Sequence, residues 1–203
     1  TRRDPAQELL YRASKKDYVR AYAEVGRVDL AYSAFARVDD AGALEMLQLL
    51  ADQYLQQGKS QKAIVAYQDL MKRAPRHKNV CLWQYSVAQA TMSLPGARNA
   101  DRVTEIENLV RLHTALAAAR TLPRAEAEEC RDNAAAMAGD HARAYHVEYA
   151  KTQDPATLAL ADRLYRVYLG AFPDATDRPQ TEYFHAELLW TRATAEPQPR
   201  LAT

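Results

Sequence analysis

The chain has 203 residues, of which 48% are hydrophobic and 26% charged, and its formal net charge is +1. This balanced charge gives no reason to expect nucleic acid or an anionic membrane surface as a partner. No stretch approaches the roughly 20 apolar residues of a membrane span, so we expect no direct membrane span. With only 6 glycines the composition favours helices, and a start at Thr1 without methionine suggests a processed or excised chain.

Helical periodicity and boundary signals predict helices along the whole chain. The first begins at Pro5 after Asp4, a common N-terminal cap, and Ser60 is expected to cap the fourth. Gly139 leaves the continuity of the seventh helix open, and residues 195–203 are predicted to be a disordered tail. The predicted helices cover 5–25, 29–38, 43–57, 60–74, 79–93, 101–119, 124–151, 155–172 and 179–194.

Residues of matching type recur when the sequence is shifted against itself. The recurring unit is a small residue followed four positions later by an aromatic one, which places both side chains on one helix face. A hairpin of two such helices cannot bury its apolar stripe alone, so neighbouring hairpins must stack. A shift of 32 pairs Tyr22 with Tyr54, Gly26 with Gly58, Ala31 with Ala63, Phe35 with Tyr67 and Val38 with Leu70; a shift of 98 pairs Ala63 with Ala161, Tyr67 with Tyr165, Leu70 with Tyr168 and Pro75 with Pro173.

Glycine and proline mark the ends of the repeated helices. We expect Gly26 and Gly58 to end first helices, because glycine accepts the left-handed conformation that terminates a helix. Pro75 and Pro173 follow second helices and stop them.

The segment from Leu47 to Pro75 resembles a tetratricopeptide repeat. Leu47 stands where the family pattern has Trp and Ala51 where it has Gly, and the span 76–155 departs from the pattern. The resemblance implies an all-α superhelix of about four helical hairpins plus a C-terminal helix. It also implies a single domain over 1–194 that binds protein partners or peptide segments, without catalysis, metal or cofactor. The matching positions are Leu47, Leu50, Ala51 and Tyr54 in the first helix and Ala63, Tyr67, Leu70 and Pro75 in the second.

In such a stack the first helices line a groove that holds the partner. The family's carboxylate clamp requires Lys and Asn at the positions of Gln48 and Asp52, so that mode of peptide binding is not expected. For each single residue the alternative is an ordinary solvated side chain. The groove residues implied by the resemblance are Glu45, Gln48, Asp52, Leu55 and Gln56 in the best repeat, with Arg143 and His146 in the fourth.

The ninth predicted helix resembles the first helix of another repeat, with no second helix after it. Its apolar face therefore either shields the preceding helix as a cap or contacts further repeats of a longer parent chain. The residues that carry this resemblance are Tyr183, Phe184, Ala186, Leu189 and Trp190.

Cys81 and Cys130 are too far apart in sequence for a CxxC redox motif or a zinc ribbon. Each lies on a predicted first helix, and first helices of consecutive repeats lie side by side, so the sulfurs could form a disulfide. An oxidised pair would indicate an extracytoplasmic compartment. The alternative is two buried thiols that act as small hydrophobic groups.

Motifs for catalysis or metal binding are missing from the sequence. His141 and His146 are five residues apart and do not share a helix face as a metal-binding pair would, and HExxH is absent. Glycine-rich phosphate loops are also absent.

Two further segments, HVEYAKTQDPATLALADRLYRVYLGAFPD (146–174) and TEYFHAELLW (181–190), resemble large tetratricopeptide proteins of the deltaproteobacterial cell envelope, some of them in gliding-motility machinery. This resemblance implies a periplasmic or outer-membrane-associated scaffold that assembles a multiprotein complex. The alternative is a cytoplasmic peptide-binding adaptor or regulator.

Overall fold

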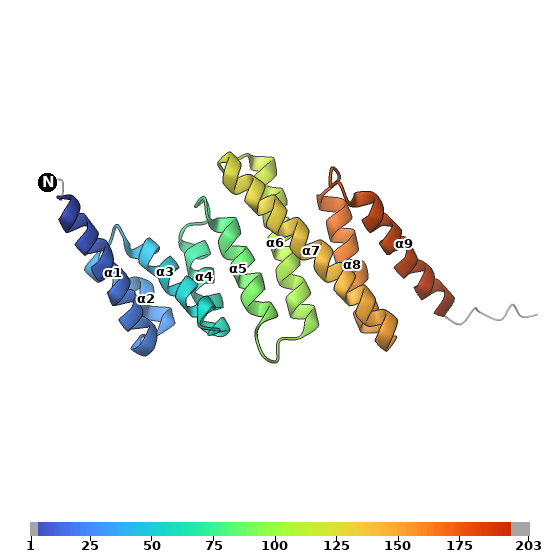
Figure 1. The fold of residues 1–203 in the computed structure, drawn as a ribbon, viewed down its shortest axis with the longest axis horizontal. Coiled ribbons are helices and arrows are strands. Elements are labelled where there is room, and N and C mark those ends of the chain that lie inside the picture. Colours follow the sequence, from blue (N-terminus) through green and yellow to red (C-terminus); the bar gives the residue numbers. More distant parts are fainter. Residues whose placement is uncertain (1–3, 196–203) are drawn as a thin grey trace, which may run out of the picture. The chain divides into compact units, whose positions relative to one another are not determined.

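A computed structural model of the chain describes residues 4–195, which are α-helical and contain no β-strand (Figure 1). The predicted all-α class is confirmed, and every predicted helix is present with ends that differ by a few residues at most. The only change of type is that the predicted second helix opens with a 3₁₀ turn, η1. The elements are α1 (Pro5–Val25), η1 (Val28–Leu30), α2 (Ala31–Val38), α3 (Ala43–Gln56), α4 (Ser60–Arg73), α5 (Val80–Met92), α6 (Asn99–Ala119), α7 (Arg124–Thr152), α8 (Pro155–Ala171) and α9 (Arg178–Ala195).

The helices belong to two compact units, Thr1–Ala97 and Arg98–Thr203. In the first unit α1 and α2 pack on α3, α3 packs on α4, and α4 packs on α5. In the second unit α6 packs on α7 and α8, α7 packs on α8, and α8 packs on α9. The single domain expected over 1–194 stays a prediction. The expected disordered tail lies outside the described residues, apart from Ala195, which ends α9.

The recurring pairs of small and aromatic residues form the centre of each unit. All six side chains are buried, with Ala63 at 0% and Tyr67 at 2% exposure. At one aligned pair the difference in burial is large, because Val38 is 57% exposed whereas Leu70 is buried. The reason is that α2 ends at Val38, so no further turn covers it. The buried pairs are Ala31 with Phe35, Ala63 with Tyr67 and Ala161 with Tyr165.

The two repeat glycines have different structural roles. Gly58 has a φ of +68°, the left-handed conformation expected after a first helix. The same expectation is wrong for Gly26, whose φ of −79° and ψ of 156° are extended. Glycine is needed there because a Cβ would lie 2.3 Å from the ring of Tyr22, whose hydroxyl donates to the carbonyl of Arg27 at 2.8 Å.

Two local expectations about helices are also resolved. Ser60 does not cap α4: Lys59 is the N-cap, and Ser60 is the buried first residue of the helix. The seventh helix is continuous through Gly139. A Cβ at Gly139 would lie 3.4 Å from the ring of Tyr168, so the missing side chain lets α7 and α8 pack closely.

Cys81 in α5 and Cys130 in α7 form a disulfide bond, which confirms the predicted pairing. Both residues are buried, at 3% exposure each. Among residues 4–195, no helix has the length and apolar character needed to cross a membrane.

Helix α9 exposes part of the apolar face that the sequence assigned to it. Thr181 and Leu188 are buried, whereas Tyr183 and Trp190 are 66% and 73% exposed. Residues 181 and 188 are seven apart and face the rest of the unit, and the resemblance of α9 to a first helix stays a prediction. Contact of the exposed face with further repeats stays a prediction.

Candidate partner-binding groove

Helix α3 has one buried face and one face that carries most of the predicted groove residues. Leu47, Leu50, Ala51 and Tyr54 are fully buried. Glu45, Gln48, Asp52 and Gln56 follow one another at intervals of three or four residues, which places them along a second stripe of the same helix.

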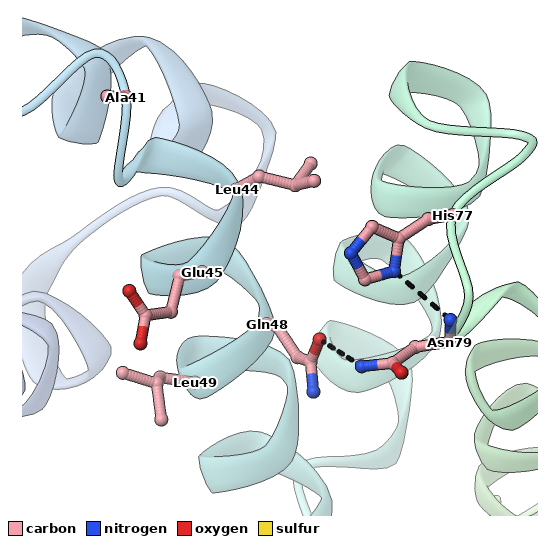
Figure 2. A pocket seen from close by; sticks show the side chains of 7 residues that line it. All are labelled: Ala41, Leu44, Glu45, Gln48, Leu49, His77 and Asn79. Atoms are coloured by element: carbon pink, nitrogen blue, oxygen red, sulfur yellow. Dashed lines mark hydrogen bonds between the residues drawn. The ribbon is translucent and has the colours of Figure 1, made fainter. Parts of the chain in front are cut away.

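Two adjoining pockets lie along this second stripe, and we call them together the α3 groove. The Glu45 pocket, of about 460 Å³, is shown in Figure 2. The Lys16 pocket, of about 250 Å³, lies beside α1. Leu49 lines both pockets, so they adjoin at its side chain. The lining residues are Ala41, Leu44, Glu45, Gln48, Leu49, His77 and Asn79 in the Glu45 pocket, and Lys16, Val19, Arg20, Leu49, Asp52, Gln53 and Gln56 in the Lys16 pocket.

The side chain of Gln48 is held in one orientation by two donors. Its Oε1 accepts a hydrogen bond from Asn79 Nδ2 at 3.2 Å, drawn in Figure 2, and a second from Trp83 Nε1 at 3.1 Å. Because both donors point at the oxygen, the amide nitrogen must face the other way, where it hydrogen-bonds Asp52.

His77 is fixed just as firmly on the opposite wall of the Glu45 pocket. The backbone N–H of Asn79 donates to its Nδ1 at 3.1 Å, and its ring stacks on that of Trp83 with centroids 4.7 Å apart. Burial and the charge of Lys78 lower the pKa of His77, so the ring is neutral near pH 7. A neutral ring that accepts at Nδ1 carries its proton on Nε2, and Figure 2 shows that nitrogen turned toward α3.

Asp52 joins the groove to the interior of the first unit. Its Oδ1 accepts a hydrogen bond of 2.6 Å from the hydroxyl of buried Tyr67. Burial raises the pKa of Asp52, while the bonds from Tyr67 and Gln48 oppose that rise. Burial and the neighbouring carboxylate likewise raise the pKa of Tyr67, so its hydroxyl stays protonated as a donor. These bonds link α3, α4 and α5 in one network.

The two pockets differ in charge. Glu45 is the one formally charged residue that lines the Glu45 pocket. Lys15 lies 3.5 Å from Glu45 and 3.1 Å from Asp39, so one cation faces two carboxylates there. The Lys16 pocket is lined by Lys16, Arg20 and Asp52, which sum to +1.

Comparisons of the chain with protein-family models, with curated proteins and with solved structures found no match. The relationship to tetratricopeptide repeats therefore stays a prediction that depends on the residues themselves.

The structure brings together four of the seven predicted groove residues and leaves three elsewhere. Leu55 is half-buried on α3 but lines neither pocket. Arg143 and His146 belong to the second unit, where both have local partners. Arg143 pairs with Asp140 at 2.6 Å, and Nδ1 of His146 lies 3.1 Å from the hydroxyl of Tyr165.

Nine of the thirteen residues that line the groove are absent from the predicted set. Lys16 and Arg20 are four residues apart on α1, a spacing that signals a shared face but not which helix that face meets. His77 precedes α5 and Asn79 is its N-cap, and no local spacing in the sequence indicates that their side chains face α3. The bond between Gln48 and Trp83 joins residues 35 apart in sequence, and no local pattern predicts it.

Proposed function

We propose that this chain is a non-catalytic protein-interaction scaffold of the tetratricopeptide kind, which holds a segment of another protein in the α3 groove. The observation that carries the proposal is the pair of pockets that adjoin at Leu49 along α3. Stacked hairpins with buried pairs such as Ala63 and Tyr67 are what a repeat array of this kind requires.

The fixed side chains of the groove support binding rather than simple solvation. Gln48 and His77 are already ordered by their neighbours, so a partner that contacts them loses little side-chain freedom of the protein. The half-exposed side chain of Leu49 supplies an apolar contact between the two pockets.

The proposal also assigns the chain to the cell envelope, as a periplasmic or outer-membrane-associated scaffold. The disulfide between Cys81 and Cys130 supports this assignment, because structural disulfides form and persist mainly in oxidising compartments. A role in gliding motility is an expectation from the sequence resemblance alone.

The groove is tested by affinity capture from cells of the source organism with two matched variants. Leu49→Arg places a charge where both pockets meet, whereas Leu55→Arg makes the same change on the same helix outside them. Proteins captured by the wild type and by Leu55→Arg, but lost with Leu49→Arg, would support the groove. Equal capture by all three, once thermal melting has shown that each is folded, would refute it.

The compartment is tested by alkylating cells before lysis and then denaturing the protein without reductant. Cysteines blocked by the alkylating agent in the denatured protein would argue for a reducing compartment and for the cytoplasmic adaptor. Thiols that react only after reduction support the envelope assignment.

A further inference from the structure

The two ends of the α3 groove carry opposite charge around a shared apolar residue. At one end the carboxylate of Glu45 is 71% exposed, and its partner Lys15 lies closer to Asp39 than to Glu45. At the other end Lys16 forms no ion pair with any of the described residues, and Arg20 pairs only with exposed Asp17 at 3.3 Å. A partner side chain can therefore still gain an ion pair at each end.

Asp52 does not cancel the positive end. Its Oδ1 is occupied by the hydroxyl of Tyr67, and the amide of Gln48 is bonded to the same carboxyl group. Its single negative charge stands against the two positive charges of Lys16 and Arg20, and Lys16 is exposed on α1.

The positions of the two pockets along α3 set the spacing that a partner must match. Gln53 marks the place of the Lys16 pocket on α3, because it lines that pocket together with Lys16 and Arg20. Glu45 and Gln53 are eight residues apart, and at a rise of about 1.5 Å per residue they are separated by about 12 Å along the helix axis. An extended chain covers about 3.3 Å per residue, so this distance corresponds to about four residues. In an extended segment, side chains four apart face the same way and the one midway between them faces with them.

We propose that the occupant of the α3 groove is an extended segment of a partner protein with a basic side chain and an acidic side chain about four residues apart and an apolar side chain midway between them. The basic group lies against Glu45, the apolar group against Leu49, and the acidic group against Lys16. The Nε2–H of His77 donates to a backbone carbonyl of the bound segment. This inference depends on the proposed function and specifies the partner's chemistry.

The test is selection from a library of random linear peptides displayed on phage, with the folded wild-type chain as target. Enriched sequences are expected to share the basic–apolar–acidic pattern in one chain direction. When the Glu45→Lys variant is the target, the enriched peptides should carry an acidic residue in place of the basic one. Neutralising the basic residue in a selected peptide should weaken binding to the wild type by about fivefold. Glu24→Lys is the control, since Glu24 is also exposed and ion-paired to a lysine, at 3.7 Å, outside the groove.

The outcomes separate this inference from the proposed function. Selected peptides that bind the wild type but not Leu49→Arg, and that share no charge pattern, would overturn the charge order while supporting the groove as the binding site. The same conclusion would follow if the charge pattern selected by Glu45→Lys were unchanged from that of the wild type. A pattern with charges about eight residues apart would indicate a helical occupant and would also overturn the proposal. No enrichment at all would overturn it as well. Binding that is insensitive to Leu49→Arg would instead refute the proposed function.

Discussion

Replacing Tyr67 by Phe removes one hydroxyl from the centre of the first unit and leaves the ring in place. Tyr67 is 2% exposed, and its hydroxyl donates to Oδ1 of Asp52 at 2.6 Å. A hydrogen bond to a charged group contributes about 1.5–3 kcal/mol to the free energy of unfolding. Because Asp52 is only half-buried, water can replace part of the lost bond, and we expect a loss of about 1.5–2 kcal/mol at pH 7.

The cost of this substitution depends on pH in a defined direction. Burial raises the pKa of Asp52 above its ordinary 3.8, and loss of the Tyr67 donor raises it further. The full cost is present above the raised pKa of the variant, where Asp52 is ionised in both proteins. It shrinks as the pH falls through that pKa, because the variant takes up its proton first, and about 1 kcal/mol remains once both are protonated.

The assay is urea unfolding at a series of pH values for the wild type, Tyr67→Phe and Tyr54→Phe. Tyr54 is a matched control, because it is fully buried in the same unit and its hydroxyl has no hydrogen-bond partner among residues 4–195. Its replacement should cost nothing or stabilise the protein by up to about 1 kcal/mol. The reasoning is refuted if both variants lose the same stability at pH 7, or if the pH dependence of Tyr67→Phe persists when Asp52 is also changed to Asn.

Three further outcomes can be checked with stability and spectroscopic measurements. Gly26→Ala should lower the free energy of unfolding by about 1–3 kcal/mol, because the new methyl group collides with the Tyr22 ring. Gly170→Ala should raise it by up to about 1 kcal/mol, because a Cβ at this position inside α8 meets open space. Equal effects of the two substitutions in chemical denaturation would contradict this. Cys81→Ser opens a covalent loop of roughly 50 residues and should lower stability by up to about 4 kcal/mol, seen as a lower melting temperature that reductant no longer changes. The pKa of His77 in the folded protein is lowered, so its contribution to stability is complete above the unfolded pKa of about 6.5 and is lost as the pH falls below that value. ¹⁵N NMR at neutral pH should show a neutral His77 ring protonated at Nε2. A charged ring at neutral pH would be inconsistent with the described contacts.

The helices could be predicted from sequence because their signals are local. Pro5, Pro155 and Gly58 mark helix ends through their own backbone preferences, and the buried pair Ala63 and Tyr67 follows from spacing on a single helix. Gly26 was misread because its conformation is set by a contact with the ring of Tyr22, although its sequence position matches that of Gly58.

Only the part of the groove that a single helix, α3, contributes could be predicted from sequence. Glu45, Gln48, Asp52 and Gln56 share a stripe of α3, and helical spacing alone places them together. The other walls come from α1 and from the segment before α5, and the interior contact of Asp52 comes from α4. Which faces of these helices meet α3 depends on packing between distant segments, about which spacing along one helix says nothing.

The bonds among α3, α4 and α5 also have an evolutionary consequence. Gln48 forms hydrogen bonds with Asn79, Trp83 and Asp52 at once. A mutation to a residue with different donors and acceptors therefore leaves several polar groups without a hydrogen bond. In related proteins that keep this groove, the residues at positions 48, 52, 79 and 83 should therefore change together. The residues at positions 53 and 56, at the rim of the groove, should vary independently of one another.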